Sequence, residues 1–172
     1  MNKKKLKYRV TYLEMNRKPS FDWPKNLKHK LSILLAESFP AWYFLFFYKQ
    51  VGKNYYWTDW LRKSEDEIDE FVNDKNVLLY TLIKDGWPVG FYMLDYRKKD
   101  ICDLSFFGLV DEVIGIGLGK YLLQTAILTA WDSKKIKKLT VNTCSLDHKS
   151  AIYLYQKYGF TPVKYKDLEK VQ

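Results

Sequence analysis

The residues best suited to chemistry form a glycine-rich segment, Ile114 to Lys120, which reads IGIGLGK. Glycines let the backbone turn tightly and direct several N–H groups at one spot. An apolar stretch typical of a helix follows at once, and a helix N-terminus adds the positive end of its dipole. The segment therefore predicts a phosphate-binding site. The alternative is a glycine-rich turn that binds nothing.

Two common nucleotide-binding motifs do not fit the spacing of these glycines. The dinucleotide motif needs a glycine where this chain has Lys120. The P-loop needs a glycine in place of Ile114 and a Ser or Thr in place of Tyr121. The segment instead resembles the pyrophosphate loop Q/R-x-x-G-x-G/A of the GNAT acetyltransferases. Gly117 and Gly119 match its glycines, whereas Ile114 replaces the usual Gln or Arg.

A second segment, residues 147–160, resembles the GNAT motif N-x-x-A-x-x-L-Y-x-K-x-G-F. The matching residues are Ala151, Leu154, Tyr155, Lys157, Gly159 and Phe160. His148 stands where the family often has an Asn that contacts the pantetheine arm. The segments VTYLEM (Val10–Met15), 48–57 and TCSLDH (Thr143–His148) resemble a bacterial GNAT subgroup, in which His148 is usual and a basic residue is common at Ile116. The resemblance extends from about Val10 to Phe160.

The resemblance implies an acetyl-CoA-dependent N-acetyltransferase that transfers acetyl directly to a primary amine. It implies that the strand Ser105–Leu109 splays from the strand Leu139–Thr143 to hold the cofactor arm. The cofactor-binding residues implied are Phe107, Leu109, Ile114, Gly115, Ile116, Gly117, Leu118, Gly119, Lys120, His148 and Tyr155. One backbone N–H near Phe107 or Leu109 would stabilise the thioester oxygen. The alternative function is a non-catalytic, acetyl-CoA-binding regulatory module.

Tyr155 is the candidate general acid, because a phenol is protonated at neutral pH and lies at the family position. The alternative is a packing tyrosine. The general base is left open between the imidazole of His148 and the strand carboxylates Glu14 and Asp103. Cys144 is not expected to act as a nucleophile, because no activating partner is evident.

The acceptor pocket is expected in the aromatic-rich segment 42–60, with Trp57 as a wall and Asp59 or Glu37 attracting an ammonium group. Most aromatic residues there are interpreted as core. The acceptor is expected to be a small-molecule or peptide amine, with a homodimer possible.

Residue patterns predict the elements that carry these side chains. A capping-box spacing, Ser64 to Glu67, predicts a short helix at 65–72. Asp85-Gly86 predicts a tight turn between two strands. Helical turns, interrupted at Pro40, are expected over residues 27–48. Further strands are expected at 9–13, 77–83, 89–94, 104–109, 139–143 and 163–165, and further helices at 118–131 and 150–158. The order indicates one α+β domain, residues 1–172, with a mixed, mostly antiparallel sheet flanked by helices.

Composition narrows the function classes. The chain has 172 residues, is 47% hydrophobic and carries a net charge of +9. The charge is interpreted as solvated lysines, as a field that attracts a phosphate-rich cofactor, or, without a recognition motif, as a weak sign of nucleic-acid binding. Two cysteines and no apolar leader favour a soluble, cytoplasmic protein with free thiols. No metal, nucleic-acid or membrane partner is expected.

Overall fold

The computed structural model describes residues 5–25 and 29–171. Its centre is a mixed sheet with the strand order β2-β3-β4-β5-β6-β1-β7. Only the pair β5–β6 is parallel, and the other neighbours are antiparallel. The strands are β1 (Lys5–Met15), β2 (Leu31–Ala36), β3 (Val77–Lys84), β4 (Trp87–Asp95), β5 (Ile101–Leu109), β6 (Lys138–Cys144) and β7 (Thr161–Val171). The predicted α+β class with a mixed sheet is confirmed.

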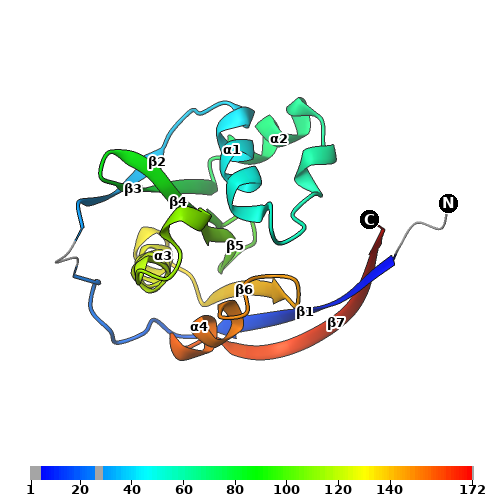
Figure 1. Ribbon diagram of the computed structural model, residues 1–172. Helices are drawn as coiled ribbons and strands as arrows, with labels where there is room; N and C mark the ends of the chain where they lie inside the picture. Colours follow the sequence, from blue (N-terminus) through cyan, green and yellow to red (C-terminus); the bar gives the residue numbers. More distant parts are fainter. Residues whose placement is uncertain (1–4, 26–28, 172) are drawn as a thin grey trace.

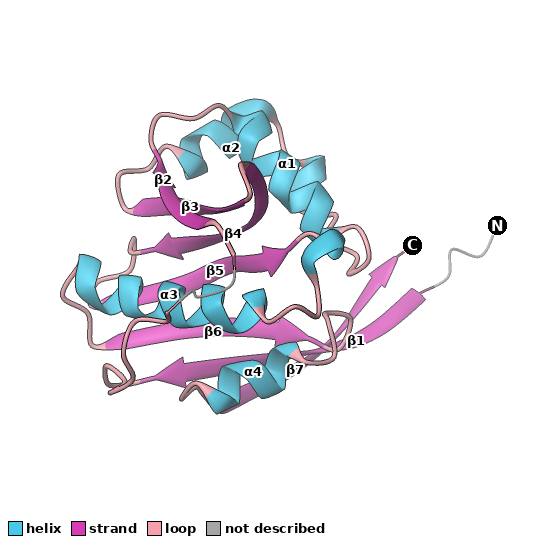
Figure 2. Cartoon of the chain, turned by 60° about the vertical axis from the view of Figure 1, so that its left-hand side comes forward, coloured by secondary structure: helices cyan, strands magenta, loops and turns pink. Residues whose placement is uncertain are grey.

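Helices cover both faces of the sheet (Figure 1, Figure 2). They are α1 (Ala41–Gly52), α2 (Glu65–Val72), α3 (Leu118–Ser133) and α4 (Ala151–Lys157). Each pair of helices packs on the sheet through its own buried hydrophobic cluster. One cluster joins α1 and α2 to β3 and β4, and the other joins α3 and α4 to β1, β5 and β6. Short 3-10 turns at Trp60–Arg62 and Asp111–Val113 complete the described elements.

Local signals fixed two elements as predicted. Helix α2 begins with a full capping box, in which the Ser64 hydroxyl accepts from the Glu67 N–H and the Glu67 carboxylate accepts from the Ser64 N–H. The turn between β3 and β4 has positive φ at both Asp85 (51°) and Gly86 (91°). This is the conformation that a two-residue hairpin turn requires, and Asp-Gly favours it.

The prediction of helical turns across residues 27–48 is wrong in its first half. Residues 26–28 lie outside the described part of the chain, and residues 31–36 form the edge strand β2, paired antiparallel with β3. In this strand Leu31 and Ile33 pack against the core cluster of α3. Pairing with β3 therefore overrides the helix propensity of the leucines, since propensity is a weak prior. Helix α1 begins at Ala41, directly after Pro40.

The sheet splits between its two parallel strands. The last paired residues of β5 and β6 are Leu104 and Val141. Beyond this pair β5 stays bonded to β4 as far as Leu109, and β6 stays bonded to β1 as far as Cys144. The strand segments 105–109 and 142–144 therefore diverge, as the sequence analysis expected.

Candidate functional site

A cleft of about 480 Å³ lies where β5 and β6 diverge. Its walls come from the 51–57 segment, the diverging strands, the glycine loop and the start of α4. The residues that line it are Val51, Tyr55, Trp57, Leu104, Ser105, Phe106, Phe107, Gly108, Leu109, Ile114, Gly115, Gly117, Gly119, Asn142, Asp147, His148, Ser150, Ala151, Leu154 and Tyr155. Most of the cofactor residues expected from the sequence therefore meet in one cavity.

The glycine loop presents backbone rather than side chains to this cleft. Gly115 and Gly117 have φ of 87° and 89°, in the left-handed region that favours glycine. Gly117 is the N-cap of α3 and no side chain caps the helix. The N–H groups of the first helical turn have no partner within a helix, so they suit an anion. Ile116 and Lys120, two of the expected residues, are exposed and do not line the cleft.

Leu118, directly after Gly117 of the glycine loop, packs into the hydrophobic core. Its side chain is buried in the cluster beneath α3, so it anchors the start of the helix rather than contacting a ligand. Ile114, where the family has Gln or Arg, does line the cleft and is 38% exposed. A phosphate bound at this loop would therefore be held by backbone N–H groups.

Tyr155, on α4, is buried and lines the cleft. Its ring makes an edge contact with Phe107 of β5, with the ring centroids 6.1 Å apart. Burial, and to a lesser degree the nearby Asp147 carboxylate, raises the pKa of the Tyr155 phenol. The phenol therefore stays protonated at neutral pH, as a proton donor must.

Asp147 joins three parts of the cleft, and the sequence analysis did not single it out. One oxygen accepts hydrogen bonds from the Thr143 hydroxyl and the Cys144 N–H, both at 2.8 Å. The other accepts from Trp57 Nε1 at 3.2 Å. The carboxylate thus fixes the end of β6 and holds Trp57 against the cleft. No local sequence signal announces a contact between residues 90 positions apart.

His148 follows on the same wall and is exposed to the cleft. Its Nδ1 accepts from the Ser150 N–H at 3.2 Å, and its ring meets Tyr55 edge-on. A neutral ring with Nδ1 occupied in this way carries its proton on Nε2, where it is free to donate. This arrangement suits a cofactor contact better than a base.

Of the two residues expected in the acceptor pocket, Trp57 and Asp59, only one lies at the cleft. Trp57 lines the cleft and packs against Tyr48 and Phe106. Asp59 does not line it: its side chain is 73% exposed and forms an ion pair with Lys170 of β7, at 3.0 Å. The structure therefore brings Trp57, but not Asp59, to the site.

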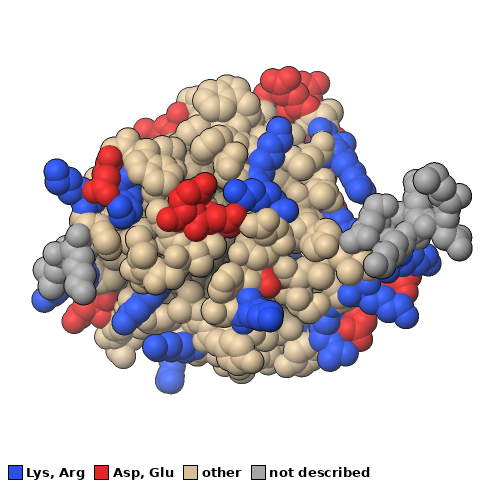
Figure 3. All heavy atoms as spheres, viewed as in Figure 1, with Lys and Arg blue, Asp and Glu red and all other residues tan. Residues whose placement is uncertain are grey.

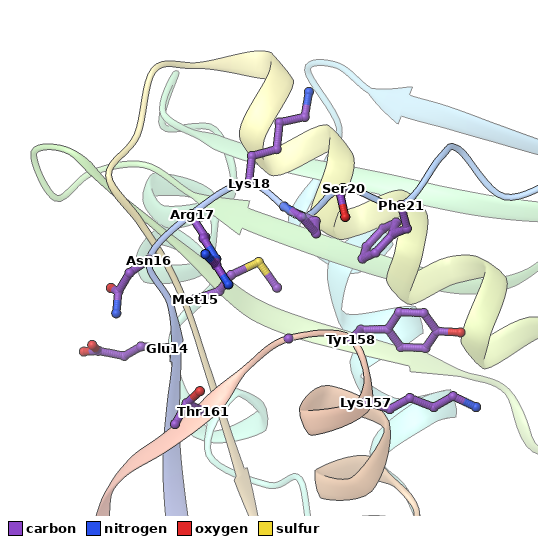
Figure 4. A pocket seen from close by; sticks show the side chains of 12 residues that line it. Glu14, Met15, Asn16, Arg17, Lys18, Ser20, Phe21, Lys157, Tyr158 and Thr161 are labelled. Carbon is purple, nitrogen blue, oxygen red and sulfur yellow. The ribbon is translucent and has the colours of Figure 1, made fainter.

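Glu14, an expected base, lies outside the cleft. It is near the opposite end of β1, paired with Lys138 at 2.8 Å. It lines a larger cavity of about 850 Å³, formed by the 14–21 segment and the turn after α4 (Figure 4). In Figure 4 its carboxylate points away from Phe21 and Tyr158. The strand carries this residue away from the glycine loop, which the sequence pattern did not reveal.

Cys144 does not have the features of a nucleophile. Burial and the Asp147 carboxylate raise the pKa of its thiol, so the reactive thiolate is disfavoured.

Basic and acidic side chains are interspersed over the face of the molecule seen in Figure 3. Ion pairs among the described residues include Lys53 with Asp111 and Lys63 with Glu67. In the described part of the chain, no helix combines the length and apolar character needed to cross a membrane.

Comparison with known proteins agrees with this geometry. Residues 36–160 match the model of the acetyltransferase (GNAT) family. The fold is similar to a functionally unknown conserved protein from Staphylococcus epidermidis, with TM-score 0.65 and 13% identity over 98% of this chain and 63% of that one. It is also similar to a GCN5-related N-acetyltransferase from Kribbella flavida, with TM-score 0.63 and 14% identity over 94% of this chain and 56% of that one.

A third similar structure is a GNAT family acetyltransferase from Elizabethkingia anophelis with acetyl-CoA bound. Its TM-score is 0.57 and its identity 23%, over 78% of each chain. No curated protein matches the sequence. This chain spans about half to two thirds of the length of the first two structures.

The split parallel strands and the glycine loop at a helix N-terminus agree with an acetyltransferase fold. The chain belongs to the GNAT acetyltransferase family.

Proposed function

We propose that this protein is an acetyl-CoA-dependent N-acetyltransferase that transfers acetyl directly to a primary amine. The observation that carries the proposal is the gap between β5 and β6, with the glycine loop at its mouth and Tyr155 inside it. On the side facing the gap, the backbone of Phe107 and Leu109 has no β6 partner. These groups fit the amides of a pantetheine arm, and the loop N–H groups fit a pyrophosphate.

Acetyl-CoA would supply an activated acetyl thioester at the point where the strands part. Tyr155 would donate a proton to the departing sulfur, since its raised pKa keeps the phenol protonated. A free N–H of β5 would bind the carbonyl oxygen as negative charge develops there. His148 would donate its Nε2 proton to the cofactor arm.

The acceptor would approach along the side of the sheet that carries α1 and α2, past Trp57 and Tyr55. The aromatic walls there suit an amine with an apolar body. We also place the protein in the cytoplasm, where Cys102 and Cys144, both free thiols, would remain reduced. A small-molecule or peptide amine as partner, and a homodimer in solution, belong to the same proposal.

Calorimetric titration with acetyl-CoA tests the first step. Gly117→Glu puts a carboxylate into the phosphate site and should abolish binding by repulsion. Gly86→Glu, in the distant β3–β4 turn, is the matched control. Gly86 has a φ of 91°, close to the 89° of Gly117, and a Cβ atom added at either glycine meets nothing within 4 Å. Equal binding by both variants, or no binding by folded wild-type protein, would reject the acetyl-CoA assignment.

Release of free thiol in the presence of amines tests the second step. Tyr155→Phe keeps the ring and removes the proton donor, so kcat should fall by about 100-fold or more while acetyl-CoA affinity stays unchanged. Binding of acetyl-CoA with no thiol release from any amine would indicate a regulatory acetyl-CoA-binding protein instead.

A further inference from the structure

The two edges of the sheet differ in their chemistry. Strands β2 and β7 are the outermost strands, at opposite ends of the sheet (Figure 2). Lysines, acidic residues and a proline run through β7, which reads TPVKYKDLEKV. Such residues are typical of edges that stay unpaired, because charged side chains and proline oppose the addition of another strand. Strand β2 reads LSILLA and carries neither a charge nor a proline, so its sequence leaves it open to pairing.

Apolar side chains of β2 are exposed on both faces of the sheet. Leu31 and Ile33 pack against the cluster beneath α3, and side chains along a strand point to alternate faces. Leu35 therefore lies on the face of α3, where it is 42% exposed, and Leu34 on the face of α1, where it is 54% exposed. An exposed, apolar edge strand is a template for pairing with another chain.

The apolar surface continues from Leu34 onto helix α1. Thr81 lies opposite Leu34 on β3, and its hydroxyl shares a hydrogen bond with the Tyr43 hydroxyl at 2.8 Å. The Tyr43 ring makes an edge contact with Trp42, with the ring centroids 6.0 Å apart. Trp42 is 66% exposed, and Phe46, one helical turn later on the same side of α1, is 38% exposed. The surface is therefore wider than a single strand, as a stable interface requires.

The backbone of β2 presents a row of outward hydrogen-bonding groups. The Asp85 N–H donates to the Lys30 C=O at 2.9 Å, so these two residues form a hydrogen-bonded pair where β2 begins beside β3. Such pairs alternate along an antiparallel ladder, so every second residue of β2 bonds to β3 and the others direct their N–H and C=O outward. The outward residues are Leu31, Ile33 and Leu35. Within residues 5–25 and 29–171, their outward groups have no hydrogen-bond partner.

An antiparallel copy of the same strand satisfies this row completely. A two-fold axis at Ile33 sets Ile33 opposite Ile33 of the partner subunit. The same axis sets Leu31 opposite Leu35 of the partner subunit, and the reverse. Each outward N–H then meets an outward C=O, and the exposed Leu35 side chain is covered by Leu31 of the partner subunit.

The charges that flank β2 fit the same arrangement. Lys30 precedes the strand, Glu37 follows it, and both side chains are exposed. Neither forms an ion pair with another described residue. With the axis at Ile33, Lys30 lies opposite Ala36 of the partner subunit and next to Glu37 of the partner subunit. The basic end of each strand therefore meets the acidic end of the other, whereas a parallel copy would bring like charges together.

We propose that the protein forms a two-fold symmetric dimer in which the β2 strands of two copies pair antiparallel, with the axis at Ile33. The proposed function includes a homodimer without locating its interface, and this inference rests on that part of it. The pairing joins the two sheets into one continuous sheet, whose outer edges are both β7. Because β7 is charged, assembly stops at two copies.

Sedimentation velocity over a range of protein concentrations tests the dimer. The wild-type protein should approach twice the 20.6 kDa of one chain. In Leu34→Lys the two new ammonium groups lie diagonally across the axis, about 7–8 Å apart, so the dimer Kd should rise by about 10–100-fold. Val163→Lys is the matched control: Val163 is 53% exposed on β7, so the same charge at the other edge should leave the Kd unchanged.

A charge swap tests the orientation of the two strands. Lys30→Glu brings two carboxylates together at each end of the pair, so the dimer Kd should rise by about 10-fold. Lys30→Glu combined with Glu37→Lys restores opposite charges at both ends and should return the Kd to the wild-type value. Both residues are exposed and lie outside the strand, so these variants keep the test valid even if Leu34→Lys fails to fold.

Single cysteines test the register. In Ile33→Cys the two new cysteines face each other across the axis, with Cα atoms about 5.5 Å apart, a separation that a disulfide spans. Leu34→Cys is the matched control, because a diagonal separation of about 7–8 Å is too long for a disulfide. Under mild oxidation, Ile33→Cys should give a cross-linked dimer, and Leu34→Cys and the wild-type protein should not.

Four outcomes would overturn the proposed dimer. They are a wild-type protein that stays monomeric at all concentrations, equal weakening by Leu34→Lys and Val163→Lys, no recovery in the charge swap, and no cross-link in Ile33→Cys. Titration with acetyl-CoA is independent of these results, because β2 does not line the cleft, and all variants should bind it equally. A folded dimer that does not bind acetyl-CoA would reject the proposed acetyl transfer and leave the interface in place.

Discussion

At Gly108, strand β5 passes α1 with no side chain between them. A Cβ atom at this position would lie 2.2 Å from Val51 Cγ1, far inside van der Waals contact. Val51 is buried, and a β-branched side chain in a helix has one strongly preferred rotamer, so the methyl cannot swing aside. We expect Gly108→Ala to destabilise the fold by about 1–3 kcal/mol, the range for an overpacked core.

A double-mutant cycle with Val51→Ala isolates this contact. That change removes the clashing methyl and leaves the Val51 Cβ at 3.5 Å, an ordinary contact distance. Gly108→Ala should then cost little, which gives a coupling energy of about 1–3 kcal/mol. Urea unfolding measures it: with a slope of about 2 kcal/mol/M, a loss of about 2 kcal/mol lowers the midpoint by roughly 1 M.

Gly119→Ala is the control for the intrinsic effect of an added methyl group. The nearest atoms to a Cβ there are 3.9 Å away, and the position is helical, so stability should be unchanged or slightly raised. The reasoning is refuted if Gly108→Ala destabilises the protein equally with Val51 and with Ala at position 51.

Two further predictions concern stability. Ser64→Ala removes the hydroxyl that accepts from the Glu67 N–H, so unfolding in urea should show a loss of about 1 kcal/mol; an unchanged midpoint would mean that the capping box is not formed in solution. Burial raises the pKa of Tyr92, Tyr96 and Tyr155, so the folded protein retains protons that the unfolded chain releases above about pH 10. Stability should therefore be fully present below that pH and fall above it. Phenolate absorbance should rise together with unfolding, and ionisation of these tyrosines in the folded state would contradict the prediction.

The sequence by itself determined the elements whose signals are local. Helix α2 follows from Ser64 and Glu67, and the β3–β4 turn from Asp85-Gly86, because each depends on contacts between residues that are close in the chain. The turn at Gly115 and Gly117 and the helix start at Leu118 follow for the same reason, because backbone conformation and a helix start are encoded within a few residues. Phosphate binding by this loop stays a prediction. With the second motif, this loop also led to the family that the comparison shows.

Only the tertiary structure decided the features that depend on distant partners. Residues 31–36 form a strand because β3 supplies their hydrogen bonds, against the helix preference of their leucines. Glu14 and Asp59 have suitable side chains for a site. However, strand register places Glu14 beside Lys138, and the loop before the 3-10 turn at Trp60–Arg62 places the exposed Asp59 beside Lys170 of β7.

The site residues that the sequence analysis missed are of the same kind. Asp147 matters because Trp57, far away in the chain, donates to it. Ser105 faces the cleft because a register shift against β4 makes it a bulge, and the Asp103 carboxylate, two residues earlier, accepts a hydrogen bond from its hydroxyl. The type of a residue determines which bonds it can form, and the sequence gives this type directly. Which partner it meets depends on the pairing of strands, and that was decided only when the whole sheet assembled.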